Sequence, residues 1–234
     1  MSILAISALT VPGKSIRKDF RKIKLNNQQR EVLNQAKEKY DYKKTKPVST
    51  FVKRSFDVIG GVIGLILTAP VVLAGAAAVK LESKGPAIFT QKRIGKDGKP
   101  FLLKKLRTMY NNTSNDHHNV TAPNDERITK TGKFLRKYSI DEFPQFINII
   151  KGDMSLVGPR PLLAHEQEAT KDFPEFVERY VVKPGAKLEY TKDGMRDLHT
   201  RFSVEKEYIE NWNLKNDFKI FTKIVKDVLY GRNY

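Results

Sequence analysis

The sequence contains no cysteine among its 234 residues. Disulfide bonds, thiolate metal sites and a cysteine nucleophile are therefore excluded, and the composition fits a reducing compartment. Histidine is also scarce: the four residues stand at positions 117, 118, 165 and 199, and none has the spacing of a zinc-binding pair on a helix. The chemistry of the chain is instead carried by carboxylates and basic side chains.

Acidic residues are few relative to basic ones, with 26 Asp and Glu against 43 Lys and Arg and a net charge of +17. Residues 1–54 alone hold 14 basic and 4 acidic residues, a net charge of +10. Such an arm suits either nucleic acid or an anionic membrane surface. The sequence shows no helix-turn-helix, RNP-type strand or zinc finger, so nucleic acid is not the expected partner. A membrane-tethered nucleic-acid binder remains an alternative.

One long stretch lacks charge altogether. Val58–Val79 is a run of 22 residues without Asp, Glu, Lys or Arg, and Pro70 lies near its middle. At about 1.5 Å per residue, a helix of this length would just cross a hydrocarbon layer of roughly 30 Å. Basic residues stand on both sides, whereas a spanning helix shows them on its cytoplasmic side only. We therefore predict a re-entrant helix that returns to the cytoplasmic face; a single span and a buried core helix remain alternatives.

Pro70 favours the bend that a re-entrant helix needs. It removes a backbone donor and its ring clashes with the carbonyl of Ile66, so a kink is expected. In lipid the freed carbonyl needs another donor, and the Thr68 hydroxyl is close enough to supply it. Glycines at positions 60, 61, 64 and 75 offer small surfaces for close helix contact. An anionic membrane surface then explains the basic arm, because each basic residue near it adds roughly 1 kcal/mol.

The chain divides into a basic N-terminal arm at 1–50, a membrane helix at 51–82 and a folded domain at 83–234. We expect a helix at 26–40 followed by a linker at 43–50. In the first half of the domain we expect a hairpin at 87–109 with its turn at Asp97-Gly98, a polar loop at 110–124, and helices at 128–136 and 144–150. In the second half we expect a rigid turn at 158–161, an interrupted helix at 162–180, a turn at 184–185, and helices at 203–211 and 217–230.

The densest chemistry lies between residues 136 and 161. Asp141 and Glu142 are adjacent carboxylates, Arg136 lies five residues before the first of them, and Arg160 stands between two prolines. Prolines fix their own φ and restrict the preceding residue, so Arg160 lies on a stiff segment that suits planar recognition of a phosphate. One carboxylate can act as a nucleophile toward phosphorus, and a second can hold Mg²⁺, which neutralises phosphate oxygens.

A purely structural explanation of the two carboxylates is also available. Ser139, followed three residues later by Glu142, fits a capping box, and acidic residues stabilise the first turn of a helix without any further function. From this tetrapeptide alone, capping is the better explanation. The neighbouring arginines, the stiff turn and the apolar run shift the weight toward a site.

The chain resembles a known family, the small monotopic phosphoglycosyl transferases, also called bacterial sugar transferases or polyprenyl-phosphate sugar-1-phosphate transferases. The similarity is good over residues 51–185 and moderate over 203–230. It is carried by KRSFD at 53–57, GPAIFTQKRIG at 85–95, KPF at 99–101, KLRTM at 105–109, nearly all of 125–161, YIENWN at 208–213 and DFKI at 217–220. The combination of an upstream membrane segment, the carboxylate pair and LVGPRP at 156–161 is specific.

The resemblance implies a fold: one re-entrant N-terminal helix and a small mixed α/β catalytic core with interfacial helices, in a protein attached to the membrane from one side. It also implies a reaction, the ping-pong transfer of a sugar-1-phosphate from a UDP-sugar to a polyprenyl phosphate, such as undecaprenyl phosphate, with release of UMP. Such a protein works at the cytoplasmic face of the bacterial inner (plasma) membrane. It would start a polysaccharide, for example an exopolysaccharide, on a lipid carrier.

Carried over residue by residue, the family's pattern makes Asp141 the nucleophile that forms a phosphosugar intermediate. Glu142 would be a ligand of Mg²⁺, the expected cofactor. Arg136, Arg160 and Lys105 would bind substrate phosphates, and Arg107 is a further candidate for that role. Other glycan-assembly enzymes are candidate partners.

The chain departs from the family's pattern in two places. Ala69 stands before the membrane proline where relatives usually have Ser. The Pro184-Gly185 pair leads into AKLEYTKDGMR at 186–196 instead of the usual ITGWAQVNGR-like loop. The second departure motivates an alternative function, a catalytically weak membrane scaffold of a glycan-assembly complex. The intact carboxylate pair favours the enzyme.

Overall fold

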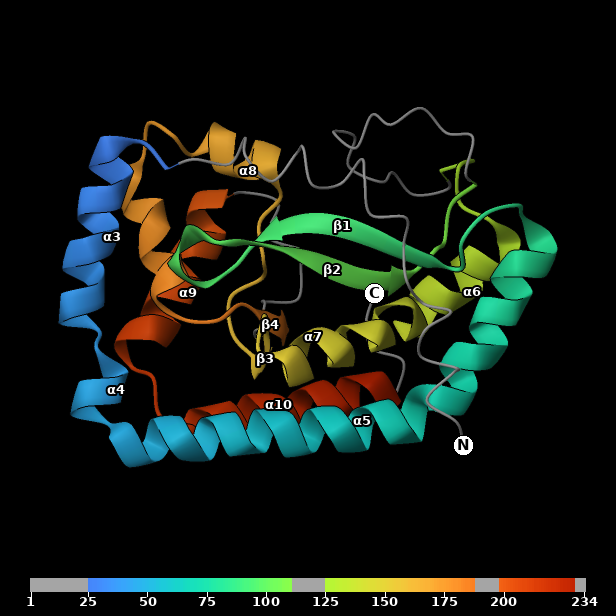
Figure 1. Ribbon diagram of the computed structural model, residues 1–234, viewed down its shortest axis with the longest axis horizontal. Coiled ribbons are helices and arrows are strands. Elements are labelled where there is room, and N and C mark those ends of the chain that lie inside the picture. The colour runs from blue at the N-terminus through green and yellow to red at the C-terminus, as the bar shows by residue number, and fades with distance from the viewer. Residues whose placement is uncertain (1–24, 111–124, 188–197, 230–234) are drawn as a thin grey trace.

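The computed structural model describes residues 25–110, 125–187 and 198–229, which form a mixed α/β structure that is mostly helical (Figure 1). Three consecutive helices, α3 (Asn27–Lys39), α4 (Tyr42–Thr45) and α5 (Pro47–Glu82), run around the outside of the molecule. The other described elements lie between α3 on one side and α5 on the other. These two N-terminal helices therefore cover two sides of the core.

α3 begins at a capping box. The Asn26 side chain accepts a hydrogen bond from the backbone N–H of Gln29 at 2.7 Å, and the Gln29 side chain accepts one from the backbone N–H of Asn26 at 3.1 Å. The helix packs against the 3-10 segment η4 (Pro174–Val181). Its buried stripe joins the main hydrophobic cluster through Leu33, Ala36 and Tyr40. The helix predicted at 26–40 is confirmed.

The linker predicted at 43–50 is wrong, because helical residues occupy most of it. α4 covers its start, and Pro47 is the first residue of α5. A proline is well tolerated at this position, where its missing N–H has no intrahelical acceptor. Pro47 therefore starts the long apolar helix instead of interrupting a loop.

α5 is a single helix of 36 residues with Pro70 inside it, and it bends within its second half (Figure 1). Its glycines face the core. A Cβ atom added to Gly64 would come within 2.6 Å of the Phe146 ring, and one added to Gly61 within 3.1 Å of Ile150. The prediction that these small residues permit close helix contact is confirmed.

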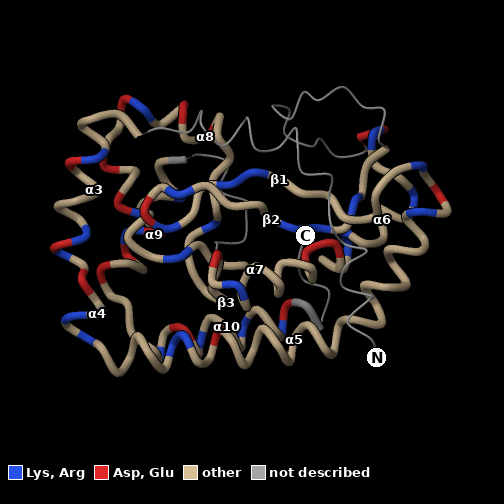
Figure 2. The backbone as a smooth tube through the Cα atoms, in the orientation of Figure 1, with Lys and Arg blue, Asp and Glu red and all other residues tan. Residues whose placement is uncertain are grey.

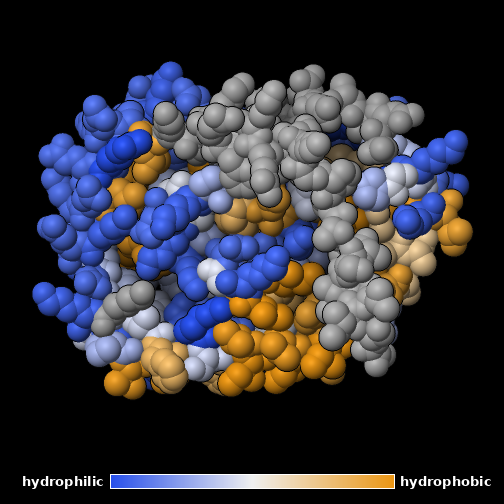
Figure 3. All heavy atoms as spheres, in the orientation of Figure 1, coloured by the Kyte–Doolittle hydropathy of each residue, from blue (hydrophilic) through white to orange (hydrophobic). Residues whose placement is uncertain are grey.

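The opposite face of α5 is not covered by the protein. Large apolar side chains on it are exposed, among them Phe51 at 73%, Ile66 at 66% and Leu67 at 72%. The uncharged stretch is the long tan section of α5 in Figure 2, and hydrophobic residues gather along this edge in Figure 3. By length and composition α5 could cross a membrane. Because only 6% of its apolar window is buried, it is not an ordinary core helix.

The Thr68 hydroxyl does not serve the carbonyl that Pro70 frees. It donates to the carbonyl of Gly64 at 2.7 Å, so the predicted bond to the carbonyl of Ile66 is wrong. A threonine side chain easily reaches the carbonyl four residues before it, and this contact often bends a helix. Thr68 therefore adds to the bend that the proline produces.

The predicted hairpin is confirmed. β1 (Ile88–Ile94) and β2 (Pro100–Leu106) are antiparallel, with Phe89 opposite Lys105. Their connection contains the short 3-10 turn η2 (Lys96–Gly98), in which Asp97 and Gly98 have φ values of 60° and 70°. A hairpin turn of type I′ requires positive φ at both central residues, and Asp-Gly adopts it readily.

A second strand pair was not predicted. β3 (Ser155–Val157) runs parallel to β4 (Gly185–Lys187), and the two backbones approach so closely that a Cβ atom on Gly185 would lie 2.1 Å from the nitrogen of Gly158. The turn predicted at Pro184-Gly185 is wrong, because Gly185 is the first residue of a strand. Strands of three residues are too short to show an alternating pattern, so periodicity does not reveal them.

The remaining described helical segments are α6 (Lys130–Lys137), η3 (Ile140–Gln145), α7 (Phe146–Lys151), α8 (Ala164–Ala169), η4, α9 (Leu198–Glu210) and α10 (Leu214–Leu229). α6, α7, α9 and α10 correspond to predicted helices. α8 and η4 correspond to the interrupted helix predicted at 162–180, and the interruption lies just before Pro174. Residues 111–124 of the predicted polar loop and most of the altered loop, from residue 188 onward, lie outside the described residues.

If α3 is an integral part of the fold, removing its central apolar side chain should destabilise the whole protein. Leu33 is 3% exposed, and replacing a buried Leu by Ala lowers the free energy of unfolding by about 2–5 kcal/mol. We expect this loss for Leu33→Ala in chemical denaturation of the detergent-solubilised protein. Asn34→Ala, on the exposed face of the same helix, should change little. Equal stability of the two variants would show that α3 is detached in solution.

Candidate active site

The two adjacent carboxylates, Asp141 and Glu142, lie in the first turn of η3. The residue before this segment, Ser139, has a φ of 53°, and its side chain forms no capping hydrogen bond. The capping-box explanation is therefore wrong. The placement of the carboxylates has to be explained by their contacts with the rest of the protein.

Asp141 is almost fully buried, with 8% of its surface exposed. Burial raises its pKa to about 6; the charge of Lys105 opposes this rise, that of Glu142 adds to it, and that of Arg136 opposes it. Desolvation of the charged form is thus the main effect. The carboxyl group is mostly ionised at neutral pH but is far less stabilised by water than a surface aspartate. Such a perturbed carboxylate is typical of a functional site.

Lys105 reaches the carboxylates from β2, which packs against η3. Its Nζ atom lies 2.6 Å from Oε1 of Glu142, and the two side chains are 20% and 43% exposed. A partly exposed ion pair of this kind contributes little to stability. The pair is better understood as a cation held at the edge of the site, where its charge acts on both carboxylates.

Arg136 comes from α6. Its Nε atom donates to Oγ1 of Thr108 at 2.9 Å. α6 approaches the backbone of Thr108, just past the end of β2, closely because Gly132 has no side chain. A Cβ atom at Gly132 would lie 2.1 Å from the carbonyl oxygen of Thr108. Three elements, β2, α6 and η3, therefore bring Lys105, Arg136 and the carboxylate pair together.

Arg107 has a different place, although it lies two residues after Lys105. Its residue is 6% exposed, and it donates from Nη1 to the carbonyl of Lys84 at 2.7 Å and from Nη2 to the carbonyl of Ser83 at 2.8 Å. These acceptors lie just past the end of α5, where helix carbonyls lack intrahelical partners. Arg107 fixes the end of the long helix, and the structure does not bring its guanidinium to the carboxylate pair.

Arg160 lies in the turn after β3, with an exposed side chain. Its charge acts on Arg93 and Glu166, whereas it is not among the groups that shift the pKa of Asp141. Burial, together with the charge of Arg160 and against the charges of Glu166 and Glu142, lowers the pKa of Arg93 to about 10. Arg93 also donates from Nη1 to the carbonyl of Pro161 at 2.9 Å, so it contacts the turn that carries Arg160.

Sequence reasoning missed Arg93 and the ion pairs around it. The carboxylate of Glu166 lies 3.7 Å from Arg93 and 3.4 Å from Arg201, and Arg179 pairs with Glu205 at 2.8 Å. Arg93 stands in one of the segments that carry the family resemblance, which is a signal that points to it. The other pairs join segments far apart in the sequence, and nothing local marks their members as partners.

Asp141 and Glu142 are the candidates for holding a divalent cation. In the described ranges, no three His, Asp or Glu side chains gather into a metal site. Mg²⁺, however, is commonly held by one or two carboxylates together with substrate phosphates. Two adjacent carboxylates, of which the Glu142 side chain is 43% exposed, fit this donor set.

The raised pKa of Asp141 affects stability. The carboxyl binds its proton more tightly in the folded protein, with a pKa of about 6, than at its ordinary value of 3.8. Its burial therefore destabilises the fold increasingly as the pH rises from about 4 to about 6. A difference of about two between the two pKa values corresponds to about 3 kcal/mol. We expect Asp141→Asn to raise the free energy of unfolding by up to this amount at neutral pH and by much less below pH 4.

Denaturant unfolding at the two pH values checks this expectation. Asp172→Asn, at an exposed position, is the matched control and should be neutral at both. A stability of Asp141→Asn at or below that of the wild type at neutral pH would contradict the raised pKa.

The match to a sequence model of the family described as "Bacterial sugar transferase" covers residues 48–231. The chain is 37% identical over 192 residues to the UDP-N-acetylgalactosamine-undecaprenyl-phosphate N-acetylgalactosaminephosphotransferase of Aeromonas hydrophila, covering 79% of this chain and 45% of the relative. It is 39% identical over 189 residues to the UDP-glucose:undecaprenyl-phosphate glucose-1-phosphate transferase of Caulobacter vibrioides, covering 77% of this chain and 71% of the relative. It is 38% identical over 184 residues to the uncharacterized sugar transferase EpsL of Bacillus subtilis, covering 76% of this chain and 87% of the relative.

The chain thus spans less than half the length of the Aeromonas relative and most of the length of the other two. The family match extends over more than half of this chain, from the start of α5 to the end of α10, and includes the carboxylate pair, Lys105, Arg136 and Arg160. The chain therefore belongs to the bacterial sugar transferase family.

Proposed function

We propose that this protein transfers a sugar-1-phosphate from a UDP-sugar to a polyprenyl phosphate, releases UMP and so starts glycan assembly on a lipid carrier. The observation that carries the proposal is the buried carboxylate of Asp141, with a pKa raised to about 6, beside Glu142, Lys105 and Arg136. Relatives named for transfer of sugar phosphates to undecaprenyl phosphate support the two substrate classes.

The first half-reaction forms a covalent intermediate on Asp141. A carboxylate oxygen attacks the β-phosphorus of the UDP-sugar, and a new oxygen–phosphorus bond forms. The bond between that phosphorus and the bridging oxygen breaks, and UMP leaves with the bridging oxygen and its electron pair. Asp141 then carries the sugar-1-phosphate as an acyl phosphate.

The second half-reaction returns the enzyme to its starting state. An oxygen of the polyprenyl phosphate attacks the same phosphorus, the acyl phosphate bond breaks, and Asp141 leaves as a carboxylate. No net proton transfer is needed, so a carboxylate that is ionised at neutral pH meets the requirement of both steps. A buried carboxylate is also shielded from water, which would otherwise compete with the lipid phosphate for the intermediate.

The basic residues have separate tasks in this scheme. Lys105 and Arg136, whose charges act on Asp141, offset the negative charge of the incoming phosphates. Arg160, exposed on its stiff turn, suits bidentate binding of the diphosphate. Arg107 contributes indirectly, because its contacts fix the end of α5.

Mg²⁺ is the proposed cofactor. Glu142 would hold it together with phosphate oxygens of the substrate, and Asp141 lies next to it in the chain. When bound, the ion would neutralise negative charge on the phosphates.

We assign the protein to the cytoplasmic face of the bacterial plasma membrane, with α5 re-entrant. The uncovered apolar face of α5, its bend and the basic residues on both sides of it support this placement. α10 extends the apolar surface with Phe218 and Val225, which are 60% and 40% exposed. It packs on α5 through the rings of Phe56 and Phe221, whose centroids are 5.0 Å apart. A soluble donor and a lipid acceptor can meet only at such an interface.

The proposed reaction predicts lipid-dependent release of UMP. Purified protein in detergent, given Mg²⁺, undecaprenyl phosphate and each of a panel of UDP-sugars, should release UMP with at least one donor. Asp141→Asn should abolish the release, because an amide cannot form the acyl phosphate, whereas the exposed control Asp172→Asn should keep it. Turnover by Asp141→Asn would remove the nucleophile assignment. Folded wild-type protein that releases no UMP with any donor would favour the scaffold alternative.

The re-entrant topology predicts that both ends of α5 lie on one side of the membrane. The chain has no native cysteine, so Lys44→Cys and Lys84→Cys, at exposed positions before and after the helix, can be labelled singly. In intact spheroplasts, neither should react with a membrane-impermeant maleimide, and both should react in inverted vesicles. Reaction of one position from each side would replace the re-entrant helix by a spanning one.

A further inference from the structure

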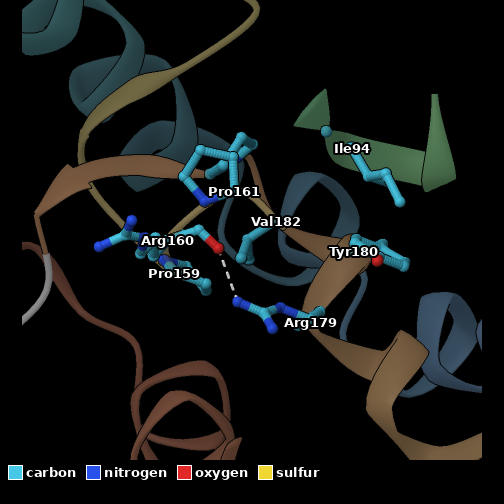
Figure 4. Close-up of a pocket in the computed structure, with 9 residues that line it drawn as sticks. Ile94, Pro159, Arg160, Pro161, Arg179, Tyr180 and Val182 are labelled. Carbon is cyan, nitrogen blue, oxygen red and sulfur yellow. Dashed lines mark hydrogen bonds between the residues drawn. The ribbon is translucent and has the colours of Figure 1, made fainter. Parts of the chain in front are cut away.

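The turn that carries Arg160 is held from inside the protein by a buried ion pair. Nη2 of Arg179, on η4, donates to the backbone carbonyl of Arg160 at 2.6 Å and to Oε1 of Glu205, on α9, at 2.8 Å. Figure 4 shows the Arg160 carbonyl facing Arg179 while its guanidinium points away. The backbone of Arg160 is thus tied to two other elements, and its side chain is left on the outside.

Both members of the pair are removed from water. The side chain of Arg179 is 2% exposed and that of Glu205 is 0% exposed. Burial raises the pKa of Glu205, while Arg179, Arg201 and a hydrogen bond from the backbone of Arg160 oppose that rise. The carboxylate therefore interacts with the Arg160 peptide as well as with Arg179. A cavity of about 10 Å³ beneath the turn, lined in part by Pro159, Pro161 and Arg179, is too small for a substrate.

Stability alone does not explain why these two positions are charged. A buried ion pair is often matched or exceeded in stability by apolar residues of similar volume, because desolvation offsets the attraction. The feature that an apolar pair could not supply is the directed hydrogen bond to the carbonyl of Arg160. The charges of the pair therefore have a task connected with that peptide.

The neighbouring arginines lead to the same conclusion. Arg93 and Arg201 each lie within 4 Å of Glu166, and Arg179 pairs with Glu205. Within the described residues, no ion pair joins the Arg160 side chain to a carboxylate. Two carboxylates, Glu166 and Glu205, thus pair with the other three arginines, whereas the Arg160 side chain, which is exposed, is available to a ligand.

From this geometry we infer that Arg179 and Glu205 are positioning residues, which fix the Arg160 peptide so that its guanidinium meets the phosphates of the nucleotide sugar. The inference rests on the proposed function, because it takes Arg160 as a phosphate-binding residue. Misplacement of a binding group by about 1 Å can lower a rate on the order of 10²-fold. Loss of the pair should therefore impair use of the donor even where the fold is intact.

The test is a variant that removes the pair and keeps the packing, Arg179→Met with Glu205→Leu. We expect it to fold with a stability near that of the wild type and to lower kcat/KM for the UDP-sugar by about 10²-fold. Arg160→Ala should lower it by a similar factor. The triple variant should be no worse than Arg160→Ala alone, because the pair acts only through Arg160.

The matched control is a second ion pair between the same two elements. Lys206 on α9 lies 3.2 Å from Glu178 on η4, and neither is hydrogen-bonded to the Arg160 peptide in the described structure. Lys206→Met with Glu178→Gln should therefore leave kcat/KM unchanged. Arg179→Lys keeps the charge but not the forked donor, and it should show an intermediate loss; this variant provides the test if the apolar double variant does not fold.

Two results would overturn the inference while the proposed function stands. One is a folded double variant with wild-type kcat/KM in an active preparation. The other is a triple variant whose loss is the product of the two separate losses, which would mean that the pair acts independently of Arg160. Wild-type protein without UMP release would instead refute the proposed function, and the positioning role with it.

Discussion

The close contact between the glycine face of α5 and the core is the constraint on which the rest of the structure depends. A Cβ atom on Gly64 would strike the ring of Phe146, and one on Gly75 would lie 3.1 Å from Leu106 and 3.2 Å from Leu135. Each of these three contacts adjoins the site: Leu106 follows Lys105, Leu135 precedes Arg136, and Phe146 follows the last residue of η3. The helix that carries the apolar face is thus the surface on which the side chains of the candidate site are assembled. The glycines have no side chains, and this fixes the distance from the site to that face.

Burial at this surface also explains the electrostatics of the site. Desolvation raises the pKa of Asp141, and two nearby cations limit the rise so that the group remains ionised at neutral pH. A carboxylate in a fully apolar site would hold its proton, and one at the surface would be stabilised by water. The intermediate environment arises because Lys105 and Arg136 come from elements that contact α5 on one side and η3 on the other.

The sequence predicted the parts of this arrangement that depend on local patterns. The uncharged run, the Asp-Gly hairpin turn and the stripe of α3 each have a short-range signature, and the structure contains all three. The family resemblance singled out Lys105, Arg136 and the carboxylate pair, which the structure brings together. The parallel pairing of β3 with β4 and the ion pair of Arg179 with Glu205 could not be predicted, because both join distant segments through contacts that leave no periodic trace. Ser139 misled local reasoning, since its residue type fits a cap while its left-handed backbone does not form one.

α3 and α4 lie before residue 48, where the family match begins. They nevertheless contact the two elements that carry the Arg179–Glu205 ion pair. α3 packs on η4, the element that carries Arg179. The hydroxyl of Tyr42, on α4, donates to the carbonyl of Ile209 on α9, the helix that carries Glu205, and Nζ of Lys46 donates to the carbonyl of Trp212 at 2.9 Å. Residues 26–46 therefore contact both η4 and α9, the two elements that hold the Arg160 turn. The positive charge of the N-terminal region supports the proposed binding to an anionic surface. Its folded part has a second consequence, because it packs on the side of the core that holds the proposed phosphate-binding arginine in place.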